Sequence, residues 1–217
     1  MPEKFIIESG ATSIENFSFS FRNDLQAVEI PEGVTTIGIS AFLFCENLKE
    51  IHLPASVVKI GKSAFCGCWN LTKINLPDGL TEIAENLFGN CLSLNNIKLP
   101  DGLKKIGNQA FKGCENLTEI KIPANVREVG EKIFADCELL SKIYCAAGSD
   151  FGKVLTDGNR AEIITFDEPI PCKENFSWQI DGGTLKIIGG DALKKISCDE
   201  NSPWYDEREL IKKIIIE

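Results

Sequence analysis

The chain has 217 residues, enough for one substantial core or two small ones, because domains usually run from about 50 to 250 residues. Its 32 acidic and 23 basic residues give a formal net charge of −9, which repels polyphosphate and argues against nucleic acid as a partner. No stretch approaches the roughly 18 consecutive apolar residues of a membrane helix, so we expect no membrane insertion. The first residues lack the basic and then apolar pattern of a secretory signal.

A fixed period of 23 residues organises the chain from residue 7 to residue 144. Two columns, each made of residues at equivalent positions of successive units, show this period most clearly. The cysteine column consists of Cys45, Cys68, Cys91, Cys114 and Cys137. The phenylalanine column consists of Phe19, Phe42, Phe65, Phe88, Phe111 and Phe134. Two columns with one period indicate six structural units, and such a period overrides any local interpretation of the sequence. The first unit departs most from the pattern, with Arg22 in the cysteine column.

Each unit has the pattern of one turn of a solenoid. The alternation Leu48-x-x-Ile51-x-Leu53 predicts a short, half-buried strand, and Pro54 ends it. Glycines after the strand predict turns, followed by inward-facing positions such as Val34. A unit this short cannot bury its apolar face alone, so the units must stack at the ~4.8 Å spacing of parallel strands. We therefore expect one strand per unit and each Phe placed over the next.

These residues resemble a known family. The run from Leu71 to Pro77, then Gly79-Leu80-x-x-Ile83 and Phe88-x-x-Cys91, is similar to the BspA-type leucine-rich repeat of bacterial surface proteins. The resemblance implies a β-rich solenoid over 1–150, with six repeats (7–144), a cap, and a parallel sheet on its concave side. It also implies a place at the cell surface or secretion, although a chain without a signal peptide leaves the cytoplasm open.

The last third of the chain loses the repeat. Residues 151–171 have the turn residues of a connection, and 172–217 form a small β-hairpin segment. Its strands are expected at 176–180 and 184–188, around Asp181-Gly182-Gly183. This segment resembles the short β leader that precedes repeat arrays in the same family. The final run Ile211-x-x-Ile214-x-Ile216 repeats the strand spacing but stops at Glu217, so we expect either a fragment of a longer protein or a lost second array.

The terminal strands of such a chain lack a neighbouring coil. The final strand and the opening strand from Phe5 to Ile7 would expose backbone groups. Uncovered strand edges favour association between chains. We therefore expect weak self-association through these ends.

The nine cysteines and one histidine give little indication of a catalytic or metal site. We interpret the cysteine column as buried, reduced, inert thiols. Bridges between Cys145 and Cys172, or between Cys172 and Cys198, stay open in an oxidising compartment. A structural zinc site needs four ligands, which one histidine and one close pair, Cys66 and Cys68, do not supply. No metal, cofactor or nucleotide is therefore expected, and no nucleophile shares a face with His52, so catalysis is not expected.

A further column holds short polar side chains before each strand. Asn47, Asn70 and Asn116 occupy it in three of the units. We interpret them as a ladder that hydrogen-bonds backbone groups in the turn, rather than as ligand-binding residues.

The remaining candidate is the exposed side of the concave sheet, where strand alternation places two polar columns. The candidate ligand-binding residues are Glu50, His52, Lys73, Asn75, Asn96, Lys98, Glu119, Lys121, Lys142 and Tyr144. Lysines gather towards the later units, a polarity that could orient a partner. The first hypothesis is a non-enzymatic adhesion module that binds a host or neighbouring-cell protein or glycan. The alternative is a structural spacer with no ligand of its own.

Overall fold

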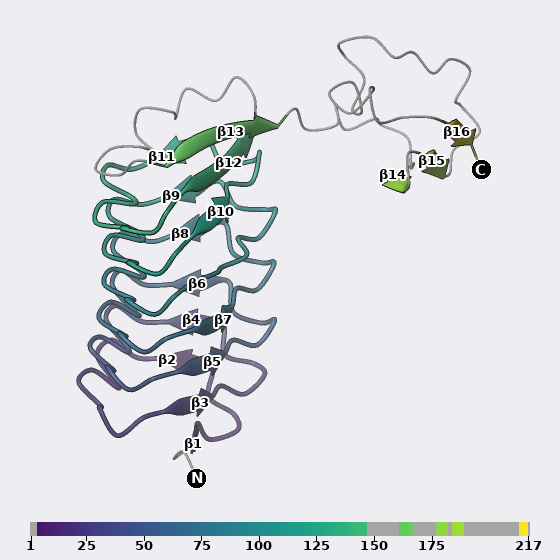
Figure 1. Ribbon diagram of the computed structural model, residues 1–217. Coiled ribbons are helices and arrows are strands. Elements are labelled where there is room, and N and C mark those ends of the chain that lie inside the picture. The colour runs from purple at the N-terminus through teal and green to yellow at the C-terminus, as the bar shows by residue number, and fades with distance from the viewer. Residues whose placement is uncertain (1–3, 147–160, 167–176, 182–183, 189–212, 217) are drawn as a thin grey trace. The chain divides into compact units, whose positions relative to one another are not determined.

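The chain forms a stack of short parallel strands and turns (Figure 1). The computed structural model describes residues 4–146, 161–166, 177–181, 184–188 and 213–216, and these residues contain no helix. Accordingly, the described part of the chain includes no helical segment of the length and apolar character that a membrane span requires. The chain divides into two compact units, Met1–Thr165 and Phe166–Glu217. We number the repeats coil 1 (7–29), coil 2 (30–52), coil 3 (53–75), coil 4 (76–98), coil 5 (99–121) and coil 6 (122–144).

The predicted strand occurs at the end of most coils, and together these strands form what we call the first ladder. One parallel sheet has the order β1 (Lys4–Ile6), β3 (Ala27–Glu29), β5 (Glu50–His52) and β7 (Lys73–Asn75). A second sheet has the order β10 (Glu119–Lys121), β12 (Lys142–Ala146) and β13 (Glu162–Phe166). The register follows the 23-residue period, so that Ile51 is aligned with Val28 and Ile74. Identical core positions therefore stack on one another.

A second series of two-residue strands corrects the expectation of one strand per coil. This second ladder consists of β2 (Ser13–Ile14), β4 (Thr36–Ile37) and β6 (Lys59–Ile60), then β8 (Glu82–Ile83), β9 (Lys105–Ile106) and β11 (Glu128–Val129). The glycine after the strand permits this pairing, because a Cβ on Gly61 would lie 2.6 Å from the Ile39 nitrogen. Glycine is therefore required at this position for close approach of two backbones, not for a turn.

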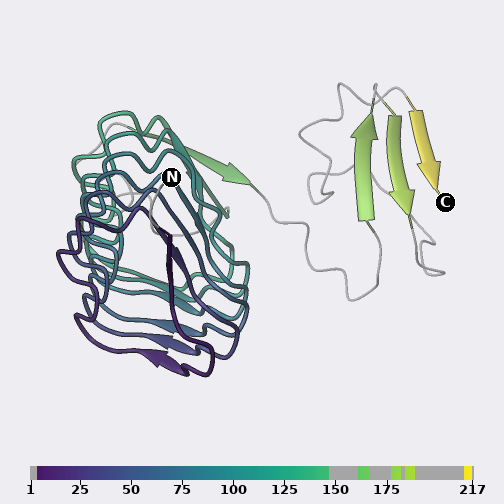
Figure 2. The ribbon, with the colours of Figure 1, turned by 90° about the horizontal axis from the view of Figure 1, so that it is seen from below.

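The remaining side of each coil is a wall of turns at 17–21, 40–44, 63–67, 86–90, 109–113 and 132–136, which we call the turn wall. In coil 2, the amides of Ser40, Phe42 and Phe44 donate to carbonyls of coil 3 over 2.8–2.9 Å. Both Ser40 and Phe44 have φ of 52°, a conformation uncommon outside glycine. Left-handed residues at these two positions recur in every coil. The coils are therefore joined by hydrogen bonds on several sides. Figure 2 shows the stacked coils in a view along the stack.

The core confirms the stacking that the phenylalanine column predicts. Ring centroids of successive phenylalanines lie 5.1–5.8 Å apart with nearly parallel planes. From Phe42 to Phe134 these side chains are fully buried. Each buried ring contributes about 1.5–3 kcal/mol to folding. The stack is therefore the main source of cohesion between coils.

The cysteine column is also buried, as predicted, and its thiols are free. Each thiol donates to a phenylalanine carbonyl of the preceding coil, as Cys68 does to Phe42 over 3.2 Å. Burial raises the pKa of Cys45 to about 11, and that of Cys91 far above its ordinary value. These thiols remain protonated at neutral pH and pack as small apolar groups.

The asparagine column forms a backbone ladder, although its acceptors differ from those expected. Asn47, Asn70 and Asn116 each donate to a carbonyl of the preceding coil, over 2.7–2.8 Å. The bonds therefore run between coils instead of within the turn. These side chains therefore link adjacent coils of the solenoid.

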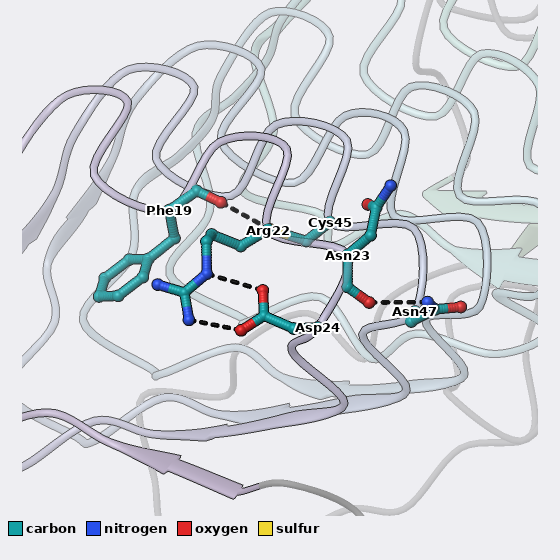
Figure 3. A network of polar contacts seen from close by, with 6 residues as sticks. All are labelled: Phe19, Arg22, Asn23, Asp24, Cys45 and Asn47. Carbon is teal, nitrogen blue, oxygen red and sulfur yellow. Dashed lines mark hydrogen bonds and ion pairs between the residues drawn. The ribbon is translucent and has the colours of Figure 1, made fainter.

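Coil 1 shows why its sequence departs from the repeat. Arg22, in the cysteine column, makes two hydrogen bonds to Asp24 at 2.6 and 2.7 Å (Figure 3). Its guanidinium lies 5.7 Å from the ring centre of Phe5, and this ring packs edge-on against Phe19. The hydrogen bond from Arg22 lowers the pKa of Asp24. Phe5 and Arg22 thus cover part of the first phenylalanine, where no earlier repeat stacks within the described residues.

The second compact unit contains the predicted hairpin. Strands β14 (Ser177–Asp181) and β15 (Thr184–Ile188) pair antiparallel, and β16 (Lys213–Ile216) pairs parallel with β15. The final strand thus has a partner along one edge. The expected connection, 151–171, contains β13, which extends the first ladder, and its β-branched residues suit a strand. Cys172 and Cys198 lie outside the described residues, and the Cys145 side chain is buried.

Candidate ligand-binding face

The candidate residues occupy the outer face of the first ladder, on the side that the resemblance implies to be concave. They come in pairs from five consecutive coils, because inward isoleucines separate the members of each pair. The pairs are Glu50 and His52 on β5, Lys73 and Asn75 on β7, Asn96 and Lys98 in coil 4, Glu119 and Lys121 on β10, and Lys142 and Tyr144 on β12. Tyr144 is half-buried and the others are exposed. Strand alternation was therefore sufficient to place them on one face.

Two shallow grooves follow this face. The larger, of about 890 Å³, extends from Lys4 across β3, β5 and β7 to Lys98, and includes Glu50 and His52. The smaller, of about 370 Å³, is lined by Asn96, Lys98, Glu119, Lys121 and Tyr144, with two isoleucines beneath. Both grooves include residues 96–98. Lys142 lines neither groove but is aligned with Glu119 in the strand register.

Three polar groove residues lie outside the two columns predicted for the repeats. Lys4 precedes the first repeat, and Thr72 and Asn95 precede their strands by one position, so a strict two-column pattern omits them. Lys4 forms an ion pair with Glu29, and this contact lowers the pKa of the Glu29 carboxyl. The pairing of Lys4 with a groove glutamate could have been predicted from the strand register of the opening segment.

Although its side chain is exposed, Asn75 makes hydrogen bonds to the backbone of the preceding strand end. Its amide oxygen accepts from the backbone nitrogen of Leu53 at 3.1 Å, and its amide nitrogen donates to the Leu53 carbonyl at 2.9 Å. The side chain therefore replaces a strand partner for Leu53. A ligand would meet Asn75 as part of the groove floor.

Coil 4 interrupts both ladders. Residues 95–99 lie between β7 and β10 but form no strand. Their backbone groups make no hydrogen bond to any residue in the described part of the chain. In the second ladder, β6 does not pair with β8. The turn wall nevertheless crosses the same boundary, for example from Ser63 to the Glu85 carbonyl at 3.0 Å. Coils 3 and 4 thus separate on the ladder sides only.

In the second ladder, one residue accounts for this separation. Ala84 occupies the column that holds Gly38, Gly61, Gly107 and Gly130 in other coils. A Cβ at each of these glycines would come within 2.4–2.6 Å of the preceding backbone, closer than atoms can approach. Ala84 carries that Cβ, so coil 4 must stand further from coil 3. The Phe65–Phe88 ring distance of 5.8 Å is the longest in the stack.

The two ladders differ in whether their lysines form ion pairs. On the second ladder and beside it, two lysines form ion pairs with a glutamate of an adjacent coil, Lys62 with Glu85 at 2.6 Å and Lys105 with Glu82 at 3.2 Å. On the first ladder, Lys73, Lys98 and Lys142 have no ion pair within the described residues. Coils 3–6 present four lysines against one glutamate on this face. Lysines thus outnumber acids on coils 3–6 of this face, whereas coils 1 and 2 contribute Glu29 and Glu50 to the larger groove.

The groove chemistry favours non-covalent contacts. His52 is exposed on β5, aligned with Glu29 and Asn75 in the strand register. The described residues contain no group of three or more side chains that could hold a metal ion. Amide, ammonium, carboxylate and hydroxyl groups on a rigid sheet can form hydrogen bonds and ion pairs with a ligand.

Comparisons with known proteins give a consistent result. A family model described as "BspA type Leucine rich repeat region" matches the chain in six copies, over residues 2–91 and 35–149. A search of curated proteins finds no significant match.

Several solved structures are similar. A leucine-rich repeat protein from Bacteroides ovatus is 40% identical over 54% of this chain and 33% of its own, with a TM-score of 0.53. A leucine-rich cell surface protein from Faecalibacterium prausnitzii is 31% identical over 65% and 47%, with a TM-score of 0.52. A leucine-rich repeat protein from T. pallidum is 36% identical over 61% and 62%, with a TM-score of 0.55. The chain therefore spans less than two thirds of each of these proteins.

Proposed function

Because the chain belongs to the BspA-type leucine-rich repeat family, we propose that it is a non-enzymatic binding module of a bacterial cell-surface protein. Its ligand, a protein or a glycan of a host or neighbouring cell, lies on the outer face of the first ladder. The F. prausnitzii relative is described as a cell surface protein, which supports the location. The family consists of repeat proteins without a common catalytic site, which supports a non-enzymatic role.

The observation that carries the proposal is the excess of lysines over acids on coils 3–6 of this face, four lysines against one glutamate. Lys98 and Lys121 occupy equivalent positions in adjacent coils, and two like charges on one face repel each other. The second ladder avoids this arrangement by alternating Lys59, Glu82, Lys105 and Glu128 in one column. A ligand of opposite charge would explain why one side departs from that alternation.

An array of matrix proteins and glycans tests the proposal. The unchanged chain should capture a ligand, and the double variant Lys98→Glu, Lys121→Glu should lose it. The matched control is Lys59→Glu, Lys104→Glu, which changes the same charge at exposed positions outside both grooves. Exposed charges contribute little to folding, so the thermal melts of all three proteins should nearly coincide. No capture by the unchanged chain would favour the spacer. Equal capture by both variants would place the ligand on another side.

A further inference from the structure

We propose that the ligand of this face is a linear acidic oligosaccharide, bound along the stack of coils from Lys73 to Tyr144. This inference rests on the proposed function and specifies the chemistry of its ligand. Four lysines, one from each of coils 3 to 6, supply the positive charge: Lys73, Lys98, Lys121 and Lys142. In a chain with a net charge of −9, this local excess attracts an anion that the remaining surface repels.

The direction of the lysine row indicates a ligand that runs across the strands. Each lysine belongs to a different coil, and successive coils of a parallel ladder lie ~4.8 Å apart. A peptide aligned with the strands would meet only one coil. A ligand aligned with the stack can meet Lys98, Lys121 and Lys142 in succession, one anionic group after another.

The spacing disfavours an acidic peptide in that direction. An extended peptide rises ~3.4 Å per residue, so side chains on one of its faces recur about every 6.8 Å. Neither value matches the ~4.8 Å between paired coils, and the spacing from coil 3 to coil 6 is not uniform because coil 4 belongs to neither sheet of the first ladder. In a chain of sugar rings that carry carboxylates or sulfates, the charges do not have to follow the spacing of a peptide backbone. The spacing of its charges is set by the rings and their linkages instead.

The interruption at coil 4 adds hydrogen-bonding capacity in the middle of the row. Residues 95–99 leave backbone donors and acceptors without partners in the described part of the chain, and residues 95–98 line the groove. Sugar hydroxyls both donate and accept, so they can satisfy N–H and C=O groups alike. The Asn96 amide offers a further donor and acceptor beside them. A polyhydroxylated ligand therefore fits this segment better than a simple anion does.

The end of the row provides an apolar surface. Tyr144 is half-buried and lines the smaller groove with Asn96, Lys98 and Glu119. An aromatic ring can pack against the C–H face of a sugar, while its hydroxyl stays available for hydrogen bonding. Glu119 is the single acid in this part of the face. It limits the number of anionic groups that the groove accepts, which gives the proposal a specific test.

Titration calorimetry at low salt provides that test. The probes are an oligogalacturonate, which has a carboxylate on every ring, an uncharged cello-oligosaccharide with the same number of rings, and a poly-glutamate peptide of equal charge. The oligogalacturonate should bind at least about tenfold more tightly than the uncharged probe, because charge-assisted hydrogen bonds are the strongest polar contacts available. It should also bind more tightly than poly-glutamate, because its hydroxyls can bond to the backbone groups of residues 95–99. Physiological salt should weaken this binding.

Variants then locate the contact. The isosteric pair Lys98→Gln, Lys121→Gln should raise the dissociation constant at least about tenfold, whereas Lys59→Gln, Lys104→Gln should leave it unchanged. Glu119→Gln should lower it, and Tyr144→Phe should retain binding that Tyr144→Ser loses. Equal affinity for poly-glutamate, or no effect of the lysine variants, would overturn the inference. If the matrix array yields a ligand on this face while no acidic sugar binds, the inference fails and the proposed function stands. If neither assay yields a ligand, both fail.

Discussion

Replacing Gly107 by alanine tests whether close backbone approach holds the second ladder together. The backbone of Gly107 does not have a positive φ, so its conformation allows alanine. On conformational entropy alone, Gly107→Ala should stabilise the protein by about 0.4–1 kcal/mol. A Cβ at this position would, however, lie 2.6 Å from the Glu85 nitrogen and 2.9 Å from the Ala84 carbonyl carbon. The structure therefore predicts the opposite sign.

The magnitude follows from the hydrogen bonds that a separation of coils 4 and 5 would break. Besides the pairing of β8 with β9 itself, three backbone bonds at the strand ends cross this boundary: Lys104 and Lys105 to the Thr81 carbonyl at 2.8 and 3.3 Å, and Gly107 to the Ile83 carbonyl at 2.8 Å. Each contributes about 0.5–1.5 kcal/mol. The loss of these three bonds, less the entropic gain, gives a net destabilisation of about 0.5–4 kcal/mol.

Urea unfolding gives the free energy, and amide hydrogen exchange locates the change. Gly107→Ala should speed exchange at residues 104–107. The reciprocal change, Ala84→Gly, should slow exchange at residues 81–84 by letting coil 4 approach coil 3, with little net change in stability because glycine costs entropy. A Gly107→Ala protein as stable as the unchanged chain, or more so, would refute the explanation of the coil 4 interruption.

Three further predictions concern the stack, its thiols and its ends. Phe88→Ala should cost about 3–5 kcal/mol by leaving a cavity between coils, and Asn70→Ala about 1 kcal/mol; similar losses in urea melts would mean that the two columns have been given the wrong roles. Burial raises the pKa of Cys45 to about 11 and that of Cys137 to about 12, from an ordinary 9.0. Above pH 9 the unfolded chain releases thiol protons that the folded chain keeps, so stability should fall as pH rises towards 11–12, by up to about 1.4 kcal/mol per pH unit for each thiol. Cys68→Ala should reduce this slope, and an unchanged slope would contradict the assignment of its buried thiol. Finally, we expect weak self-association through terminal strands, which light scattering over a concentration series would detect and Ile214→Lys should reduce. A strictly monomeric chain at high concentration would mean that those edges are already covered.

The repeated core could be predicted because its columns keep the same residue types. Phe65, Phe88 and Phe111 stack since each has the same neighbours 23 residues away. The turn wall could not be predicted in this way. Its left-handed positions hold residues as different as Phe17, Ser40 and Lys132, so backbone hydrogen bonds between coils, not side-chain preference, set their conformation.

The interruption at coil 4 was visible in the sequence as Ala84 among glycines. Its consequence depends on a separation between two backbones, which a column of letters does not give. The candidate face itself follows from strand alternation. The double hydrogen bond of Asn75 to Leu53 depends on side-chain geometry, so the sequence could not separate Asn75 from its neighbours in the column.

Hydrogen exchange of residues 95–99, with and without a captured ligand, tests the central claim most directly. These backbone amides lie on the proposed binding face and have no hydrogen-bond acceptor within the described residues, so they should exchange rapidly in the free protein. A ligand on the outer face of the first ladder should slow them markedly and leave the second ladder and the turn wall unchanged. Unchanged exchange at 95–99, with protection confined to either of the other two sides, would contradict the account.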